Sequence, residues 1–298
     1  IFWRIHQGVV VPANALVEGI AAMSRKDFNH QIPLLTGDEW DDLAETFNQT
    51  LAGMEELEVA RTVQTRLLPN KPVQTREWCF TGENIMTSGV GGDYYDAFLF
   101  DDGSCVFAVG DVSGHGVSAA LLVGMVKAAM QILTARGMRS PSDFLKRLNG
   151  LVLRHLGKKL AMTMLVGYAT PDGKLSLANA GHPYPYLCRK TGHVQQLQAP
   201  GYPVGIIERA KYKDFQAELN AGDFIVFYSD GLVEQTGPGK ESFGYSRLGE
   251  SLKPLIGYSA KDLIRSLQEG LVTYSQTTQW NDDVTVVVFQ RLSSLNAS

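Results

Sequence analysis

Residues 91–116 read GGDYYDAFLFDDGSCVFAVGDVSGHG, and this stretch decides the fold because it holds two apolar runs around a turn signal. The turn signal is Asp101-Asp102-Gly103, which favours a β-hairpin. With a three-residue loop, Asp93 lies directly across from Asp111, on the same face of the hairpin. With a two-residue Asp102-Gly103 loop, Asp93 pairs with Val112 instead, and the two acids lie on opposite faces.

Charge in this region favours a bound cation. Two carboxylates about 4 Å apart repel by roughly 4 kcal/mol at an effective dielectric of about 20, so either one stays protonated or a cation lies between them. No Lys or Arg occurs between Glu77 and Val126, whereas seven acids do. A metal ion is therefore the expected partner of Asp93 and Asp111. A solvated acidic hairpin is the alternative, and it is the better interpretation for Asp101 and Asp102.

Composition excludes several classes of protein. The chain has 298 residues, a net charge of −4 and 19% charged residues, which describes an ordinary globular protein and predicts no nucleic-acid partner. Its three cysteines are isolated, so a reducing compartment and no zinc site are expected. The sequence contains no run of eighteen apolar residues, so it predicts no membrane span. The sequence opens IFWRIHQGVVV without an initiator Met, and we expect an upstream membrane or sensor segment outside it.

The first part of the sequence predicts two amphipathic helices. Pro12 suits a first helical turn, and an apolar stripe follows it to about Arg25. A connector containing Pro33 and Gly37 leads to Asp38, which can cap a second helix that continues to Pro69 with heptad-like apolar spacing. Neither helix can bury its stripe alone, so pairing with another copy of the chain is expected.

From Trp78 onward the pattern changes to strands with two pairs of helices. Helices are expected over 117–136, 140–156, 246–255 and 260–276. Further strands are expected over 78–86, 160–170, 174–180, 184–189, 194–197, 214–219, 223–229 and 284–290. Hairpins dominate the connections, which predicts mainly antiparallel sheets covered by helices, an α+β fold.

Two more acidic positions stand at strand ends. Asp230 follows the apolar run DFIVFYS, and Asp282 and Asp283 precede VTVVVFQ. If these strands are antiparallel neighbours, Asp230 lies beside Asp282 and Asp283. Together with Asp93 and Asp111 they would form an all-oxygen site suited to Mn²⁺ or Mg²⁺. Two such ions about 3.5–4 Å apart serve phosphoester hydrolysis through a metal-bound water.

The motifs GGDYYD, GDVSGHG, SDGL and NDDVT, with LLP and NAGHPYPYL, resemble the PPM metal-dependent Ser/Thr protein phosphatases of the SpoIIE/RsbU type over about residues 60–291. The resemblance implies a four-layer α-β-β-α sandwich and two ions, Mn²⁺ or Mg²⁺. It implies that Asp111 bridges both ions and that the main-chain carbonyl of Val112 is a ligand. It also assigns Asp93 to the second ion and Asp230 and Asp282 to the first, while Asp283 stays an alternative to Asp282.

Three further residues have two interpretations each. His115 could donate a proton to the leaving serine or threonine, or it could be a surface loop histidine. His182 starts a Pro-rich strand and is expected to be structural, with a site role as the alternative. Asp96 is three residues from Asp93, so on a regular strand it faces the other way and is expected to be a structural or supporting residue.

The N-terminal helices resemble a HAMP signal-relay module over about residues 5–58, although a plain dimerising coiled coil would show the same periodicity. We therefore expect a HAMP module at 1–58, a linker helix at 59–72, a phosphatase domain at 73–292 and a tail at 293–298. The expected protein is a homodimeric phosphatase, the cytoplasmic domain of an inner-membrane protein, and the family resemblance implies that it acts on a phosphorylated STAS-type regulator. The alternatives are an inactive dimeric module that binds a partner protein and, further off, a diguanylate cyclase.

Overall fold

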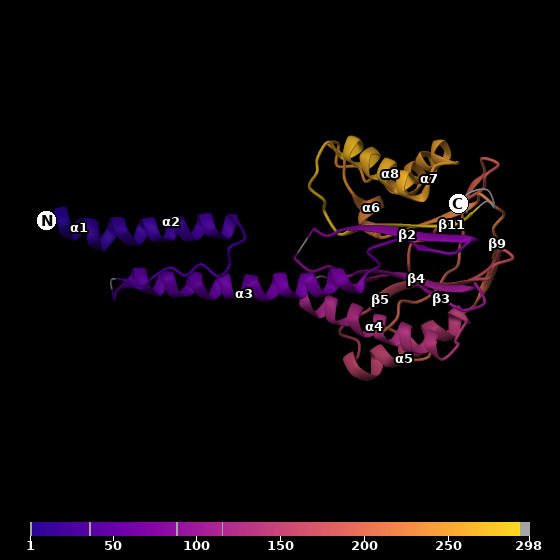
Figure 1. Cartoon of the computed structure of the whole chain (residues 1–298), viewed down its shortest axis with the longest axis horizontal. Coiled ribbons are helices and arrows are strands. Elements are labelled where there is room, and N and C mark those ends of the chain that lie inside the picture. Colours follow the sequence, from indigo (N-terminus) through magenta and orange to yellow (C-terminus); the bar gives the residue numbers. More distant parts are fainter. Residues whose placement is uncertain (1, 36, 88, 115, 293–298) are drawn as a thin grey trace. The chain divides into compact units, whose positions relative to one another are not determined.

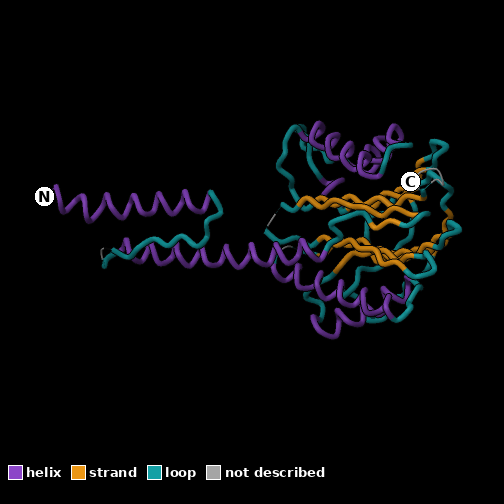
Figure 2. Tube along the Cα trace, viewed as in Figure 1, coloured by secondary structure: helices purple, strands orange, loops and turns teal. Residues whose placement is uncertain are grey.

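The computed structural model describes residues 2–35, 37–87, 89–114 and 116–292. It divides into two compact units, residues 1–63 and 64–298. The first unit is helical, and the second contains every strand within the described residues. Figure 2 shows this separation of helix and strand along the chain.

The first unit consists of two helical segments joined by a connector. Helix α1 (Phe2–Ile5), a π-helical turn (His6–Val10) and α2 (Val11–Ser24) form the first segment, and α3 (Glu39–Leu67) forms the second and extends past the unit boundary. The connector packs on both. The Asn48 side chain of α3 bonds the backbone N–H and carbonyl of Ile32 at 2.8 and 2.9 Å, and the Ile32 side chain lies against Gly19 of α2. Ile32 and Leu51 are buried, but Leu43 and Leu57 remain 48% and 41% exposed, as expected for a stripe that one copy cannot bury.

The second unit is a sandwich of two antiparallel sheets between two helical layers (Figure 1). The first sheet has the order β1-β2-β11-β10-β7-β8 and the second the order β3-β4-β5-β6-β9. The strands of the first sheet are β1 (Val73–Gln74), β2 (Trp78–Ile85), β7 (Tyr186–Cys188), β8 (Val194–Gln196), β10 (Phe224–Tyr228) and β11 (Val284–Arg291). Those of the second are β3 (Asp93–Leu99), β4 (Cys105–Val112), β5 (Met162–Ala169), β6 (Lys174–Ala180) and β9 (Phe215–Glu218).

Helices cover the outer face of each sheet, which confirms the predicted four-layer α+β sandwich. The first sheet is covered by α7 (Gly244–Leu252) and α8 (Ala260–Ser275), and the second by α4 (Val117–Ala135) and α5 (Pro141–Leu156) (Figure 1). Two shorter helices, α6 (Asp230–Glu234) and a 3₁₀ turn (Lys253–Leu255), complete the domain. The inner faces meet in an apolar core where Phe107 stacks on Phe289 with ring centroids 4.4 Å apart.

Helix α4 alone among the described helices is long and apolar enough to cross a membrane. In this fold it covers the second sheet, and Leu122, Val123, Val126 and Met130 are buried there. Its small residues allow close packing, since Leu67 lies 3.7 Å from the position of a Cβ on Gly124. Its place in the core therefore explains the apolar residues on one face of α4, whereas Val117, Leu121 and Ile132 are exposed.

Candidate active site

The hairpin of β3 and β4 pairs Asp93 with Asp111, which confirms the three-residue loop register. Leu99 pairs with Cys105 at the closed end, and the Phe100 N–H donates to the Ser104 carbonyl across the loop at 2.9 Å. The Asp111 carboxylate oxygen and the Val112 carbonyl oxygen both lie near Gly92, at 3.1 and 2.8 Å from the position of a Cβ there. Two of the predicted oxygen ligands therefore face one point.

The other acids come together through β10 and β11, which are antiparallel neighbours as predicted, with Tyr228 paired with Val286. Asp230 begins α6 directly after β10, while Asp282 and Asp283 precede β11. The start of α6 touches this turn, because a Cβ on Gly231 would meet the Asp283 carbonyl oxygen. The Ser229 hydroxyl joins the strands by donating to the Asp283 carbonyl at 3.2 Å and accepting from the Thr285 N–H at 2.9 Å.

Electrostatics shows that the acids of the two sheets meet at one rim. Burial raises the pKa of Asp111 to about 7, and repulsion from Asp230, Asp282 and Asp283 adds to it. Burial and then the charge of Asp111 hold the pKa of Asp93 well above its usual range. Burial, followed by Asp282, also raises the pKa of Asp230. Carboxylates that repel one another in a partly buried place are a donor set suited to a divalent cation.

The site is not closed around an ion. Within the described part of the chain, no three His, Cys, Asp or Glu side chains are already arranged as a metal-binding group. The oxygen-only chemistry and the raised pKa values nevertheless fit Mn²⁺ or Mg²⁺, because a cation would remove the repulsion that the carboxylates now bear. The groups that could hold the cation are Asp93, Asp111, the Val112 carbonyl, Asp230 and one of Asp282 and Asp283.

Comparison with known proteins identifies the family. Residues 101–292, more than half of the chain, match the family model described as Stage II sporulation protein E (SpoIIE). The chain belongs to the SpoIIE family. Residues 4–56 match the HAMP domain model. The SpoIIE-type chain is therefore a metal-dependent protein Ser/Thr phosphatase of the PPM type that carries a HAMP domain, which links it to membrane-receptor signalling.

Individual relatives support this assignment. Phosphoserine phosphatase RsbU of Bacillus subtilis is 32% identical over 254 residues, which are 82% of this chain and 74% of RsbU. Protein IcfG of Synechocystis is 24% identical over 97% of this chain but only 52% of its own length. The structure of the SiaA-PP2C domain of Pseudomonas aeruginosa superposes with a TM-score of 0.72 at 22% identity, over 81% of this chain and 98% of that one. The RsbU and RsbW domains of Rv1364c from Mycobacterium tuberculosis give 0.62 at 28% identity, over 72% and 60%.

The two adjacent acids of the SpoIIE-type NDDVT motif lie in different surroundings. Asp283 is only 7% exposed, and one of its carboxylate oxygens accepts from the Thr87 N–H at 2.8 Å and the Thr87 hydroxyl at 3.0 Å. Asp282 is exposed, and its carboxylate accepts the Asp283 N–H at 2.7 Å. Asp283 therefore holds the loop after β2, while Asp282 is open to solvent.

The remaining predicted residues fall into three cases. His115 lies outside the described residues. Asp96 faces away from the rim as predicted and forms a salt bridge of 2.6 Å with Lys127 of α4. His182 is 2% exposed, and burial lowers its pKa to about 3, so the ring is neutral. It bonds Thr163, the residue paired with Asp111 in β5, which places it beside the rim and not in the core alone.

Several supporting residues were not predicted. The Thr285 hydroxyl donates to the Asp93 carboxylate at 2.5 Å, and Asn84 bonds Thr285 at 2.7 Å. The alternation of NDDVT places Thr285 and Asp283 on one face of β11, so periodicity could have pointed to Thr285. Gln64, at the end of α3, carried no sequence signal. Its side chain is buried and pairs with the backbone carbonyl and N–H of Gly91 at 2.5 and 3.1 Å, two residues before Asp93.

Replacing Gln64 with alanine is expected to lower the apparent Mn²⁺ affinity roughly tenfold, as for other groups that orient a metal ligand. The substitution removes both hydrogen bonds that hold the segment leading into Asp93, and it leaves the Gly91 groups without these partners. Mn²⁺ titration of phosphatase activity measures the change. Gln216→Ala on β9 removes an exposed glutamine and is the control. Equal Mn²⁺ dependence of the two variants would contradict this role.

Replacing Gly231 with alanine is expected to cost about 1–3 kcal/mol of unfolding free energy and to lower activity on the order of a hundredfold. The new methyl group would meet the Asp283 carbonyl oxygen, a backbone atom, so α6 and Asp230 must move away from Asp282. Chemical unfolding and phosphatase rates measure the two effects. Gly239→Ala is the matched control, because a Cβ at Gly239 meets nothing within 4 Å. A normal rate for Gly231→Ala would show that the spacing of these acids is not critical.

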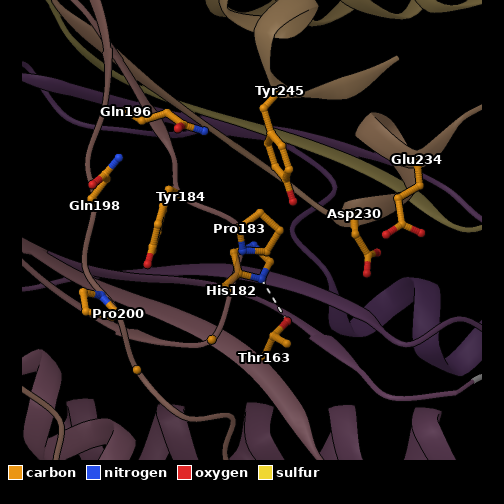
Figure 3. Close-up of a pocket in the computed structure, with 12 residues that line it drawn as sticks. Thr163, His182, Pro183, Tyr184, Gln196, Gln198, Pro200, Asp230, Glu234 and Tyr245 are labelled. Atoms are coloured by element: carbon orange, nitrogen blue, oxygen red, sulfur yellow. Dashed lines mark hydrogen bonds between the residues drawn. The ribbon is translucent and has the colours of Figure 1, made fainter. Parts of the chain in front are cut away.

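A cavity of about 550 Å³ adjoins the acidic rim and shares Asp230 with it (Figure 3). Its other lining groups come from β5, from the segment after β6, from the end of β8 and the segment after it, and from α6 and α7. His182, Tyr245 and Glu234 surround it, with Tyr245 directing its hydroxyl toward the space between His182 and Asp230 (Figure 3). The cavity is large enough for several residues of a polypeptide segment.

Proposed function

We propose that this chain removes phosphate from phosphoserine or phosphothreonine on a protein regulator of the STAS type, using two Mn²⁺ or Mg²⁺ ions held at the acidic rim. The observation that supports it most strongly is the meeting of acids from two sheets, with Asp111 next to Asp93 in register and repelled by the charges of Asp230, Asp282 and Asp283. A cluster of like charges, most of them partly or fully buried, is maintained at a cost in stability, which is typical of catalytic sites.

The residues would divide the work as follows. Asp111 and the Val112 carbonyl would bind at the centre, Asp93 on one side and Asp230 and Asp282 on the other. Bound divalent ions would supply Lewis-acid chemistry and positive charge for the phosphoryl oxygens. Thr285 holds the orientation of Asp93, and Thr87 holds Asp283. His115, outside the described residues, remains our candidate for the proton donor to the leaving alcohol.

The substrate class rests on the relatives. RsbU of Bacillus subtilis is named a phosphoserine phosphatase, and one similar structure joins an RsbU domain to an RsbW domain. Another related structure is described as part of the bacterial stressosome. These names support a phosphorylated protein substrate in a partner-switching system. They do not support the rival proposal of a purely binding module, and the SpoIIE assignment removes the basis for a diguanylate cyclase.

For regulation we propose a homodimer, joined through the apolar stripes of α2 and α3, as the cytoplasmic part of an inner-membrane receptor. The boundaries would be HAMP 1–58, linker helix 59–72, phosphatase 73–292 and tail 293–298, the last outside the described residues. Helix α3 is continuous from Glu39 to Leu67, and its last turn includes Gln64, which bonds the Gly91 backbone. A twist of the linker helix would therefore reach the segment that carries Asp93.

The test is hydrolysis of a phosphoserine peptide, a phosphotyrosine peptide and p-nitrophenyl phosphate by the purified chain, with Mn²⁺, with Mg²⁺ and with EDTA. We expect release of phosphate from the phosphoserine peptide in either metal, little from the phosphotyrosine peptide and none in EDTA. Equal rates with and without metal, or no hydrolysis of any probe, would contradict the proposal. A rate that does not change on deleting residues 1–58 would contradict the regulatory part alone.

A further inference from the structure

The cavity beside the acidic rim has an unusual balance of charge. Asp230 and Glu234 are its only charged lining residues within the described chain, and no Lys or Arg lines it. Both acids belong to α6, at its first and last positions. Asp230 would be neutralised by the ion that it is assigned to hold, so Glu234 is the carboxylate left to face an occupant and to select it for positive charge.

Glu234 is free to serve an occupant. Its side chain is exposed, and within the described residues it has no salt-bridge or hydrogen-bond partner. It points into the same space as Asp230 (Figure 3), and burial together with the charges of Asp230 and Asp282 raises its pKa. A guanidinium or ammonium group placed there would gain a carboxylate that no protein cation now neutralises.

His182 adds an unpaired polar atom to the same cavity. Its Nδ1 lies 3.1 Å from the Thr163 hydroxyl, and the tautomer of the ring decides which of the two donates. The His182 Nε2 is buried and has no protein hydrogen-bond partner within the described chain. Buried polar atoms are rarely left unpaired, so Nε2 suits a polar group of an occupant, such as a backbone N–H or carbonyl.

The rest of the lining suits a polypeptide better than a small molecule. Gln198 and the Tyr184 hydroxyl have no side-chain partner among the described residues, and Gln196 makes only a 3.5 Å contact to Tyr228. Side-chain amides and tyrosine hydroxyls bond peptide groups of any sequence, while Tyr245 offers an aromatic face to an aliphatic or cationic side chain. A segment lying in this cavity is next to Asp230 and hence next to the acidic rim.

We propose that this cavity binds the part of the phosphoprotein substrate that flanks the phosphorylated residue, and that Glu234 selects substrates with a Lys or Arg in that flank. The inference rests on the proposed phosphatase function and extends it to substrate choice. The acid at Glu234 acts on the flanking side chain, whereas the acids of the rim would hold the ions that act at the phosphoryl group.

The test uses the full chain with Mn²⁺ and a set of phosphoserine peptides in which one flanking position, scanned on both sides, is Lys, Ala or Glu. At one or two positions we expect Lys to raise kcat/KM about fivefold over Ala and Glu to lower it. Glu234→Gln should remove this preference, and Glu234→Arg should reverse it in favour of Glu. The ratio between two peptides is the readout, because an effect on metal binding changes both rates alike.

Glu250→Gln is the matched control, since Glu250 is an exposed glutamate of α7 that pairs only with Lys253 among the described residues. It should keep the wild-type preference. A preference that persists in Glu234→Gln, or equal hydrolysis of all peptides by the wild type, would overturn the inference and leave the phosphatase function standing. No hydrolysis of any peptide or of p-nitrophenyl phosphate would overturn the proposed function, and the inference with it.

Discussion

Replacing Asp111 with asparagine is expected to lower Mn²⁺-dependent kcat/KM for p-nitrophenyl phosphate about a thousandfold while making the metal-free protein more stable. Asp111 stands at the centre of the rim, where it touches Asp93 in register and is repelled by the acids of the other sheet. The neutral amide keeps the shape of the side chain but removes the charge. Loss of activity and gain of stability together distinguish a functional acid from a structural one.

The gain in metal-free stability follows from the pKa of Asp111, which burial and its acidic neighbours raise to about 7. At pH 8 without metal, the wild type must hold this carboxylate ionised in a place that disfavours the charge. Removing the charge should raise the free energy of unfolding on the order of 2 kcal/mol. Phosphate-release kinetics and urea unfolding in EDTA measure the two effects.

Asp101→Asn makes the same chemical change in the exposed hairpin loop and should alter neither quantity. A stable but fully active Asp111→Asn protein would refute the assignment of Asp111 to the catalytic site. An inactive protein with lowered metal-free stability would show that Asp111 supports the fold instead.

The second large effect is that metal should stabilise the protein strongly at pH 8 and hardly at pH 5. Asp93, Asp111 and Asp230 have folded-state pKa values above the ordinary value of 3.8. Their contribution to stability is complete below pH 3.8. It is lost as pH rises through the folded-state pKa values, and that of Asp111 is about 7. Each group then lowers the free energy of unfolding by up to about 1.4 kcal/mol per pH unit. A bound divalent ion restores the lost stability, and protons compete with that ion for the carboxylates as pH falls.

Thermal unfolding in EDTA and in excess Mn²⁺ from pH 5 to 8 measures this, with the difference in Tm as the readout. At about one hundred times Kd, the ion adds about 2.7 kcal/mol. The Tm in EDTA must be subtracted from the Tm in Mn²⁺ because His182 has the opposite pH dependence. Its pKa is lowered to about 3, so its contribution to stability is complete above pH 6.5 and is lost as pH falls. Mn²⁺ should raise the Tm of Asp111→Asn much less than that of the wild type. A rise in the wild-type Tm that does not depend on pH would contradict the assignment of these acids to the metal site.

Local sequence patterns determined most of the elements and one half of the site. The Asp101-Asp102-Gly103 signal and the flanking apolar runs predicted the hairpin, because a hairpin is set by residues close in the chain. They left two loop registers open, and the structure decided for the one that pairs Asp93 with Asp111. The same locality applies to the start of α5, where the Ser140 hydroxyl accepts the Asp143 N–H and caps the helix. The motifs of the acids likewise identified the family before any fold was known.

Tertiary structure alone decided which distant groups surround those acids. Gln64 reaches Gly91, and Glu234 shares a cavity with His182, because two sheets and the end of α3 pack together over separations that no local pattern encodes. The different surroundings of Asp282 and Asp283 also needed the fold, since adjacent identical residues differ only in the groups that they bond. Sequence determines what is set by neighbouring residues and periodicity, whereas burial, repulsion and unpaired groups arise only when remote segments meet.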